Sequence, residues 1–285
     1  MVARNVLLIG ANGGLGRAVA RQLIDRGDSV TALVSQQATL EQFERDVPGS
    51  HPVLALDLAD ADAVRDFAAT LIPKIAPLNA VVFCAAVSPF APAEMSSLDE
   101  FRRTLEINCI SLLAVYQSAM PALRRDGGRL VITSSLSGRV ATPMMGAYVA
   151  SKFALEGLAD VMRQEASEWG VPVIVLQPGT IDTPVLNRSR DALAARLAAL
   201  SDSERGLYGR LYRQMLYRIE EALAAGGLMR PEVVAGAVIE AIDSPDPLPR
   251  YRIGADAEFL IEASRTKSDR EIDAIILGLY RSAPI

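Results

Sequence analysis

Short apolar runs alternate with longer amphipathic segments along most of this 285-residue chain. The apolar runs have the length of buried strands, and the longer segments have helical spacing. Strands are expected near residues 5–9, 29–34, 53–56, 80–84, 129–133, 172–176 and 250–253, and helices near 14–26, 60–72, 97–123, 147–168 and 231–242. This alternation predicts a parallel sheet with helices on both faces. The expected fold is α/β, a doubly wound parallel sheet of about seven strands in one domain over 1–285.

Residues 184–229 form an insertion between the sixth strand and the next helix. Helical spacing predicts helices over Ala192–Leu200 and Ser203–Ala225, the second with a stripe of Leu207, Leu211 and Met215. We expect this segment to be a helical lid over the ligand cleft that decides the substrate. Such a stripe is also typical of a helix that simply packs on the body of the protein.

Composition and charge exclude several classes of protein. Half of the residues are hydrophobic, but no apolar stretch reaches the 18 or so residues of a membrane span. The net charge is −5 and the basic residues are scattered, so nucleic acid is not expected as a partner. The N-terminus enters a strand almost at once, without the pattern of a secretion signal, so a cytoplasmic location is expected.

Metal binding and disulfide bonds are not expected either. Cys84 and Cys109 are isolated in apolar surroundings, and His51 is the single histidine. Neither a metal site nor a disulfide framework can be assembled from these residues. The cysteines are expected to pack as small hydrophobic side chains.

A glycine-rich turn joins the first strand to the first helix. Gly10, Gly14 and Gly16 give the pattern Gly-x-x-x-Gly-x-Gly. Glycine lets the backbone turn tightly and approach a pyrophosphate group at the N-terminus of the helix. Alone the motif is a weak signal, but its place between strand and helix makes it a strong one.

Three side chains near the fifth strand can move a proton on and off an oxygen atom. Tyr148 and Lys152 are four residues apart, so a helix would place them on one face, and Ser135 ends the apolar run before them. Tyrosine has a pKa of roughly 10 and needs a nearby positive charge to act as a base at neutral pH. The Ser135 hydroxyl could hold a carbonyl or alcohol oxygen meanwhile. Each residue alone is more often ordinary packing, a turn or a helix cap.

The glycine turn and the Ser-Tyr-Lys set together resemble the short-chain dehydrogenase/reductase family, whose fold is Rossmann-like. The resemblance implies that Asn108 completes a catalytic tetrad through a water-linked proton path, with Asp57 beside the adenine. It also implies that the loop 178–183 holds the nicotinamide carboxamide. The expected catalytic residues are Asn108, Ser135, Tyr148 and Lys152. The expected cofactor-binding residues are Gly10, Asn12, Gly13, Gly14, Leu15, Gly16, Ser35, Asp57, Leu58, Ala85, Tyr148, Lys152, Pro178, Gly179, Ile181 and Thr183.

The chain departs from the family pattern in the central strands. Ile9 stands where the family usually has Thr, and residues 83–86, Phe-Cys-Ala-Ala, replace Asn-Asn-Ala-Gly. Both usual polar sites belong to one network that supports the central strands. Their joint replacement by apolar residues predicts a repacked site. Ala86 adds a methyl group where the backbone could run close to the cofactor.

NADP(H) is favoured as the cofactor, and NAD(H) is the alternative. Val34 stands where a carboxylate would bind the ribose hydroxyls of NAD. Ser35 and Gln36 can donate hydrogen bonds to a 2′-phosphate, and Arg17 follows the glycine turn. In the alternative, Arg17 is a solvated helix residue and Ser35 belongs only to a turn.

Near the C-terminus, a Pro-rich stretch at 245–249 precedes Arg250-Tyr251 and then a Gly-x-Asp-Ala sequence that ends in Asp256 and Ala257. In this order the C-terminal part of the chain loosely resembles the branch of the family that contains hydroxysteroid and retinol dehydrogenases. The resemblance implies an NAD(P)-dependent oxidoreductase that interconverts an alcohol and a ketone or aldehyde on a bulky apolar substrate. It also implies a homodimer or homotetramer built on the helices at 97–123 and 147–168. The alternatives are a non-redox epimerase or dehydratase on the same fold, and a cofactor-sensing or scaffold protein.

Overall fold

The computed structural model describes residues 3–49 and 51–281, and its centre is a parallel sheet of seven strands. Their order across the sheet is β3-β2-β1-β4-β5-β6-β7. Strands β2 and β3 are added on one side of β1 and strands β4 to β7 on the other, so the strand order reverses between β1 and β4. In such sheets ligands bind at this switch point, at the carboxyl ends of the strands. The strands are β1 Asn5–Ile9, β2 Ser29–Val34, β3 Val53–Ala55, β4 Ala80–Phe83, β5 Arg129–Thr133, β6 Val173–Pro178 and β7 Arg250–Ile253. The expected doubly wound sheet is confirmed.

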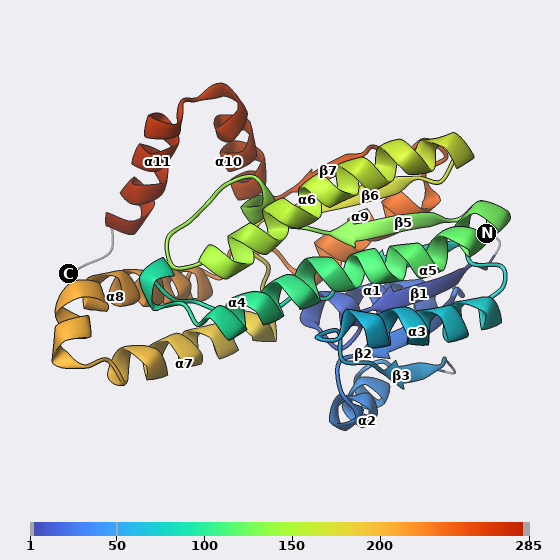
Figure 1. Ribbon diagram of the computed structural model, residues 1–285, viewed down its shortest axis with the longest axis horizontal. Helices are drawn as coiled ribbons and strands as arrows, with labels where there is room; N and C mark the ends of the chain where they lie inside the picture. The colour runs from blue at the N-terminus through green and yellow to red at the C-terminus, as the bar shows by residue number, and fades with distance from the viewer. Residues whose placement is uncertain (1–2, 50, 282–285) are drawn as a thin grey trace.

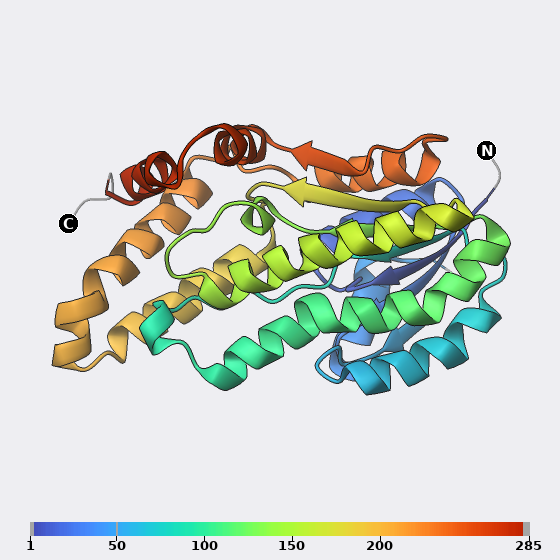
Figure 2. The same ribbon diagram turned by 45° about the horizontal axis from the view of Figure 1, so that its top comes forward.

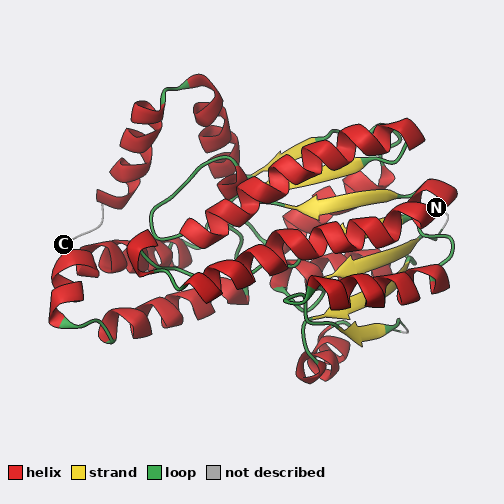
Figure 3. Ribbon diagram, in the orientation of Figure 1, coloured by secondary structure: helices red, strands yellow, loops and turns green. Residues whose placement is uncertain are grey.

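Helices cover both faces of the sheet (Figures 1 and 3). Helices α3, α5 and α6 pack on one face through one buried apolar cluster, while α1, α2 and α9 pack on the other through a second. The helices of these two layers are α1 Gly14–Asp25, α2 Gln37–Asp46, α3 Ala61–Leu71, α4 Leu98–Leu105, α5 Ser111–Asp126, α6 Gly146–Ala166 and α9 Pro231–Asp243.

A third group of helices, here called the outer helices, lies beyond the carboxyl ends of the strands, on the left in Figures 1 and 2. It contains α7 Pro184–Ala198, α8 Asp202–Ala224, α10 Ala255–Thr266 and α11 Asp269–Arg281. These helices share a separate apolar cluster, which includes Tyr212, Met215 and Ile276. Residues 184–229 are therefore largely helical. None of the helices in the described ranges is long and apolar enough to cross a membrane.

The boundaries of two predicted helices differ from expectation. Helix α7 begins at Pro184 instead of Ala192, because proline in the first turn is preset for a helix. In α8, Tyr212 and Met215 are buried but Leu207 is 72% exposed, so the inward face is rotated from the predicted stripe.

The long helix expected at 97–123 is interrupted by one π-helical turn, η3 (Glu106–Ile110), between α4 and α5. Such turns are rare and occur frequently at functional sites. Asn108 lies in the middle of this turn and is fully buried. The interruption therefore marks the residue that the family resemblance singled out.

The departures at Ile9 and Phe83 form one repacked patch. The two residues are directly paired in the register of β1 and β4, and both are fully buried in the same apolar cluster. A polar side chain there would meet hydrophobic neighbours. The structure thus places an apolar contact where the family usually has a polar network.

We expect Phe83→Asn to lower the free energy of unfolding by about 3–5 kcal/mol, because it empties a buried aromatic site and buries an amide. Ile9→Thr should cost about 1–3 kcal/mol, since its hydroxyl would lack a partner. The measurement is urea unfolding, with Ile9→Val as the size control at about 0.5–1.5 kcal/mol. A neutral or stabilising effect of both polar substitutions would show that the polar network survives in this chain.

Candidate active site

A large cleft of about 840 Å³ opens at the carboxyl ends of the strands. It is lined by the turn after β1, the ends of β2 and β4, the segment after β5, α6 and the loop after β6. All the predicted site residues except Asn108 line it: Gly10, Asn12, Gly13, Gly14, Leu15, Gly16, Ser35, Asp57, Leu58, Ala85, Ser135, Tyr148, Lys152, Pro178, Gly179, Ile181 and Thr183. The fold thus gathers these separate motifs in one cleft.

The glycine turn is too tightly packed to accept side chains. Gly10 has a φ of +80°, and a Cβ atom on it would lie 2.6 Å from the backbone nitrogen of Ala85. A Cβ atom on Gly16 would lie 2.2 Å from the carbonyl oxygen of Gly10. The N-terminus of α1 follows directly, so its free backbone N–H groups face the cleft without a side-chain cap. This turn fits a dinucleotide pyrophosphate.

The end of β2 presents polar donors and no carboxylate. The Asn12 amide donates to Ser35 Oγ over 3.1 Å, and the Ser35 N–H donates to Asn12 Oδ1 over 3.3 Å. The hydroxyl hydrogen of Ser35 thus remains free to donate. Helix α2, which the sequence pattern did not reveal, begins at Gln37 with its N-terminus next to Ser35 and has no acidic residue in its first turn.

Arg17 was expected near a 2′-phosphate, but it does not line the cleft. Its Nε lies 3.3 Å from Asp46 Oδ2 at the end of α2, and the residue is not part of the lining. The carboxylate of Asp46 draws the guanidinium away from the cleft. Only Ser35 and Gln36 remain from the set of donors that the sequence suggested for a 2′-phosphate.

Asp57 and Leu58 line the same end of the cleft, where an adenine is expected. Asp57 Oδ1 accepts from the Ala59 N–H over 3.0 Å and lies 3.7 Å from a guanidinium nitrogen of Arg103. The carboxylate is exposed, so this ion pair contributes little to stability.

Lys152 is the most constrained polar residue of the site. Its side chain is completely buried, and its Nζ donates to the carbonyl oxygen of Thr133 over 2.9 Å. Burial lowers its pKa from 10.5 to about 8, against the opposing charge of Glu156. The ammonium therefore lies at the end of β5, where it faces the cleft.

Tyr148 and Ser135 complete the predicted set. Lys152 Nζ lies 5.7 Å from the centre of the Tyr148 ring. Burial raises the pKa of Tyr148, and a hydrogen bond with Ser135 acts in the opposite direction. Ser135 Oγ also accepts from the Ser137 N–H over 3.1 Å, which fixes the hydroxyl at the end of the strand. The Ser-Tyr-Lys set is thus assembled in the structure.

Asn108 lies behind the cleft and has no free hydrogen-bonding group on its side chain. Its amide donates to the Val87 carbonyl and to Ser151 Oγ, both over 2.9 Å, and its Oδ1 accepts from the Val87 N–H over 2.8 Å. Ser151 in turn donates to the Tyr148 carbonyl over 2.7 Å. Asn108 therefore ties the segment after β4 to the first turn of the helix that carries Tyr148.

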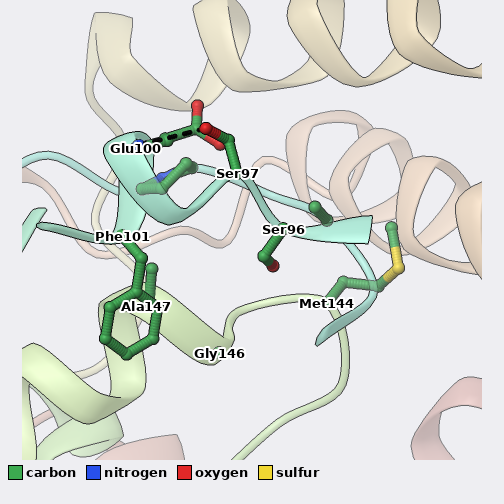
Figure 4. Close-up of a pocket in the computed structure, with 9 residues that line it drawn as sticks. Ser96, Ser97, Glu100, Phe101, Met144, Gly146 and Ala147 are labelled. Carbon is green, nitrogen blue, oxygen red and sulfur yellow. Dashed lines mark hydrogen bonds between the residues drawn. The ribbon is translucent and has the colours of Figure 1, made fainter. Parts of the chain in front are cut away.

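The start of α6 is fixed by a second contact. Met144, just before the helix, has a φ of +70°, which is rare for a residue other than glycine, and its carbonyl accepts from the Ala91 N–H over 2.8 Å. Figure 4 shows Met144, Gly146 and Ala147 beside Ser96 and Phe101. These contacts leave Tyr148 little freedom to move along the cleft.

The loop after β6 is held by a residue that the sequence motifs indicated only as part of a loose C-terminal likeness. Asp256, at the start of α10, accepts from the Thr180 N–H over 2.9 Å and from its own helix at Ala257 over 2.9 Å. It lines the cleft together with Pro178 and Gly179. Asp256 thus fixes the loop that is expected to meet a nicotinamide.

The far half of the cleft is mostly apolar and is built by the outer helices. Met215 and Ile219 of α8 line this half, together with Leu260 of α10 and Tyr280 of α11. The sequence analysis did not predict Ile219, Leu260 or Tyr280. These were missed because no motif distinguishes them from ordinary helix packing. Met145 also lines this half, whereas Met144 does not.

Comparison with known proteins agrees with this geometry. The family model described as short chain dehydrogenase matches residues 4–194. The chain belongs to the short-chain dehydrogenase family. It is therefore an NAD(P)-dependent oxidoreductase in general terms, as the sequence resemblance predicted.

Similar members of the short-chain dehydrogenase family cover nearly the whole chain. Human short-chain dehydrogenase/reductase family 9C member 7 is 30% identical over 98% of this chain and 90% of its own length. NADPH-dependent 3-dehydrocapnine reductase from Ornithobacterium rhinotracheale is 26% identical over 95% of each chain. A short chain dehydrogenase from Burkholderia cenocepacia, solved in complex with NADP, has a TM-score of 0.72 and 21% identity over 96% of this chain and 98% of that one, which supports the fold.

Proposed function

We propose that this short-chain dehydrogenase is an NADP(H)-preferring oxidoreductase that interconverts an alcohol and a ketone or aldehyde, with Tyr148 as the acid–base group. The observation that carries the proposal is the joint placement of Ser135, Tyr148 and the buried Lys152 in the cleft that also contains the glycine turn. The proposed catalytic set moves a proton, and a bound nicotinamide dinucleotide would supply or accept the hydride.

The roles of the side chains follow from their chemistry. Tyr148 donates its phenolic proton to a carbonyl oxygen, or removes the proton of an alcohol in the opposite direction. Ser135 holds the same oxygen by a hydrogen bond. Lys152 favours the phenolate through its positive charge and can donate to the hydroxyls of a nicotinamide ribose. Asn108 positions the helix through Ser151.

The substrate class that the cleft favours is bulky and apolar. Its far half is bounded by Met215, Ile219, Leu260 and Tyr280, which come from three different outer helices. Flexible methionine and large apolar side chains suit a hydrophobic ligand whose polar atoms are few. Residues 184–229 would then form the lid that decides which substrate binds.

A preference for NADP(H) is supported by the end of β2. Ser35 has a free hydroxyl hydrogen, Gln36 lines the cleft, and no carboxylate stands at that position to repel a phosphate. The N-terminus of α2 begins immediately afterwards and carries a partial positive charge. One of the similar proteins is described as NADPH-dependent.

A homodimer or homotetramer is supported by exposed apolar side chains on the helical layer that contains α4 and α6. Leu98, Ile110, Phe153 and Val161 are between 44% and 70% exposed. They belong to α4, η3 and α6, the region expected to pair with another copy of the chain. We include self-association through this face in the proposal.

Tyr148→Phe should reduce turnover of bulky ketones with NADPH by roughly 10²–10⁴-fold, because the proton donor is lost while the ring remains. NADPH affinity should change by less than a few-fold. The measurement is steady-state kinetics on a panel of steroid, aryl and long-chain ketones, together with fluorescence titration of NADPH. Tyr116→Phe, away from the cleft, is the matched control. Normal turnover in Tyr148→Phe would refute the role of Tyr148.

Ser35→Asp should weaken NADPH binding roughly tenfold or more while NADH binding changes little, because the new carboxylate repels a 2′-phosphate; tenfold corresponds to about 1.4 kcal/mol. Dissociation constants for both cofactors give the answer. Ser35→Asn keeps a polar donor without a charge and serves as the control. An equal loss for both cofactors would mean that Ser35 does not face the 2′-position.

A further inference from the structure

A buried carboxylate lies one helical turn beyond Lys152. Glu156 follows Lys152 by four residues on α6, so the two side chains share a face of the helix. Glu156 is 2% exposed and Lys152 is completely buried. A carboxylate in such a place is costly unless it is paired and hydrogen-bonded, so its partners show what holds it there.

Three donors from three other segments hold the Glu156 carboxylate. Gln177 of β6 donates its amide to Oε1 over 2.9 Å. Arg139, which follows β5, and Arg250, the first residue of β7, donate to Oε2 over 3.1 Å and 3.0 Å. Two guanidinium groups and an amide thus hydrogen-bond to both oxygens of the carboxylate, as a buried charge requires. Glu156 is therefore a paired carboxylate held in a fixed position inside the protein.

A second carboxylate lies farther along the same helix. Asp160, one more turn along α6, lies 2.8 Å from Arg250 and 2.7 Å from Arg163. Its side chain is 33% exposed. Asp160 thus shares Arg250 with Glu156, but it is more exposed and lies two helical turns from Lys152.

The surroundings of Lys152 contain few charges. In the part of the chain that the structure describes, its ammonium makes no ion pair within 4.0 Å, and it donates a hydrogen bond to the neutral Thr133 carbonyl. The titratable groups that face it are Cys84 just after β4, Cys109 from η3, and Tyr148 and Glu156 from its own helix. Burial raises the pKa of both thiols, so they are neutral near pH 7. Glu156 is thus the anion that opposes the effect of burial on Lys152.

We propose that Glu156 is a positioning residue that keeps Lys152 in its cationic form, and that Arg139, Arg250 and Gln177 hold the carboxylate in place for this effect. The effect on protonation does not depend on the proposed function. Its consequence for catalysis rests on that function, because only a charged Lys152 can favour the Tyr148 phenolate and donate fully to a ribose.

In a purely structural role, Glu156 would only connect α6 to the edge strand β7. Any substitution in the network would then lower the stability of the protein, but the pKa of Lys152 would stay unchanged. The two roles are therefore separated by the proton equilibrium of Lys152 and not by stability.

The chain is well suited to a direct measurement because it contains only three lysines, Lys74, Lys152 and Lys267. Protein labelled with ¹³C at lysine Cε gives one NMR signal for each, and Lys74→Arg and Lys267→Arg assign them. In the wild type, Lys152 should titrate well below the ordinary lysine pKa, because it is buried. In Glu156→Gln its pKa should fall further by about one unit or more, the size expected for loss of a nearby opposite charge. Asp160→Asn, the matched control, should leave it unchanged.

The lowered pKa of Lys152 determines how NADPH affinity depends on pH. A lysine loses its charge as pH rises through its pKa, so Lys152 in Glu156→Gln becomes neutral at a lower pH than in the wild type. NADPH affinity should therefore decline at a lower pH in Glu156→Gln, by the same shift, and not in Asp160→Asn. Glu156→Asp, which keeps the charge, should restore most of the wild-type profile.

An unchanged or raised pKa of Lys152 in Glu156→Gln would overturn the inference. Should that variant be too unstable, the double variant Glu156→Gln, Arg250→Gln must give Lys152 a lower pKa than Arg250→Gln alone, because the two proteins differ only in the carboxylate. A wild type that binds no NADPH would refute the proposed function, while the lysine titration would still decide the role of Glu156.

Discussion

The cleft depends on one charged group kept out of water, the ammonium of Lys152. Its burial lowers its pKa to about 8, so its charge near neutral pH is maintained with little margin. The Thr133 carbonyl at the end of β5 accepts its hydrogen bond, and Glu156 supplies the opposing charge from within α6. Of the two partly exposed arginines that hold Glu156, Arg250 connects α6 to β7. The contacts that hold α6 against β7 therefore also hold the carboxylate that keeps Lys152 charged.

A second constraint is the close approach of backbones at the switch point of the sheet. The turn after β1 packs so closely on Ala85 after β4 that no side chain fits at Gly10. The same two strands carry the apolar pair Ile9 and Phe83, which replaces the polar network usual in the family. Asn108 then fixes the segment after β4 to the helix of Tyr148 through Val87 and Ser151. Tight packing and one buried amide thus set the distance between the two halves of the site.

The sequence predicts the parts of this structure that repeat locally or belong to a motif. Apolar runs place all seven strands, and the glycine turn and Tyr148–Lys152 spacing predict which residues meet in the cleft. Helix α2 escapes prediction because Phe43 is its single buried residue, which leaves no apolar stripe to detect. Asn108, in the π turn, bonds to Val87 across 21 residues of chain, and Arg250 meets Glu156 from 94 residues away. Such contacts leave no periodic trace in the sequence.

The central claim is that the cleft binds a nicotinamide dinucleotide with Lys152 and Tyr148 beside the reacting end. A crystal structure of the protein grown with NADP⁺ tests it most directly, through the distance from Lys152 Nζ to the hydroxyls of the nicotinamide ribose. The account predicts hydrogen-bond contact there, with the pyrophosphate on the turn at Gly10–Gly16. A cofactor bound elsewhere, or a nicotinamide ribose out of reach of Lys152, would contradict it.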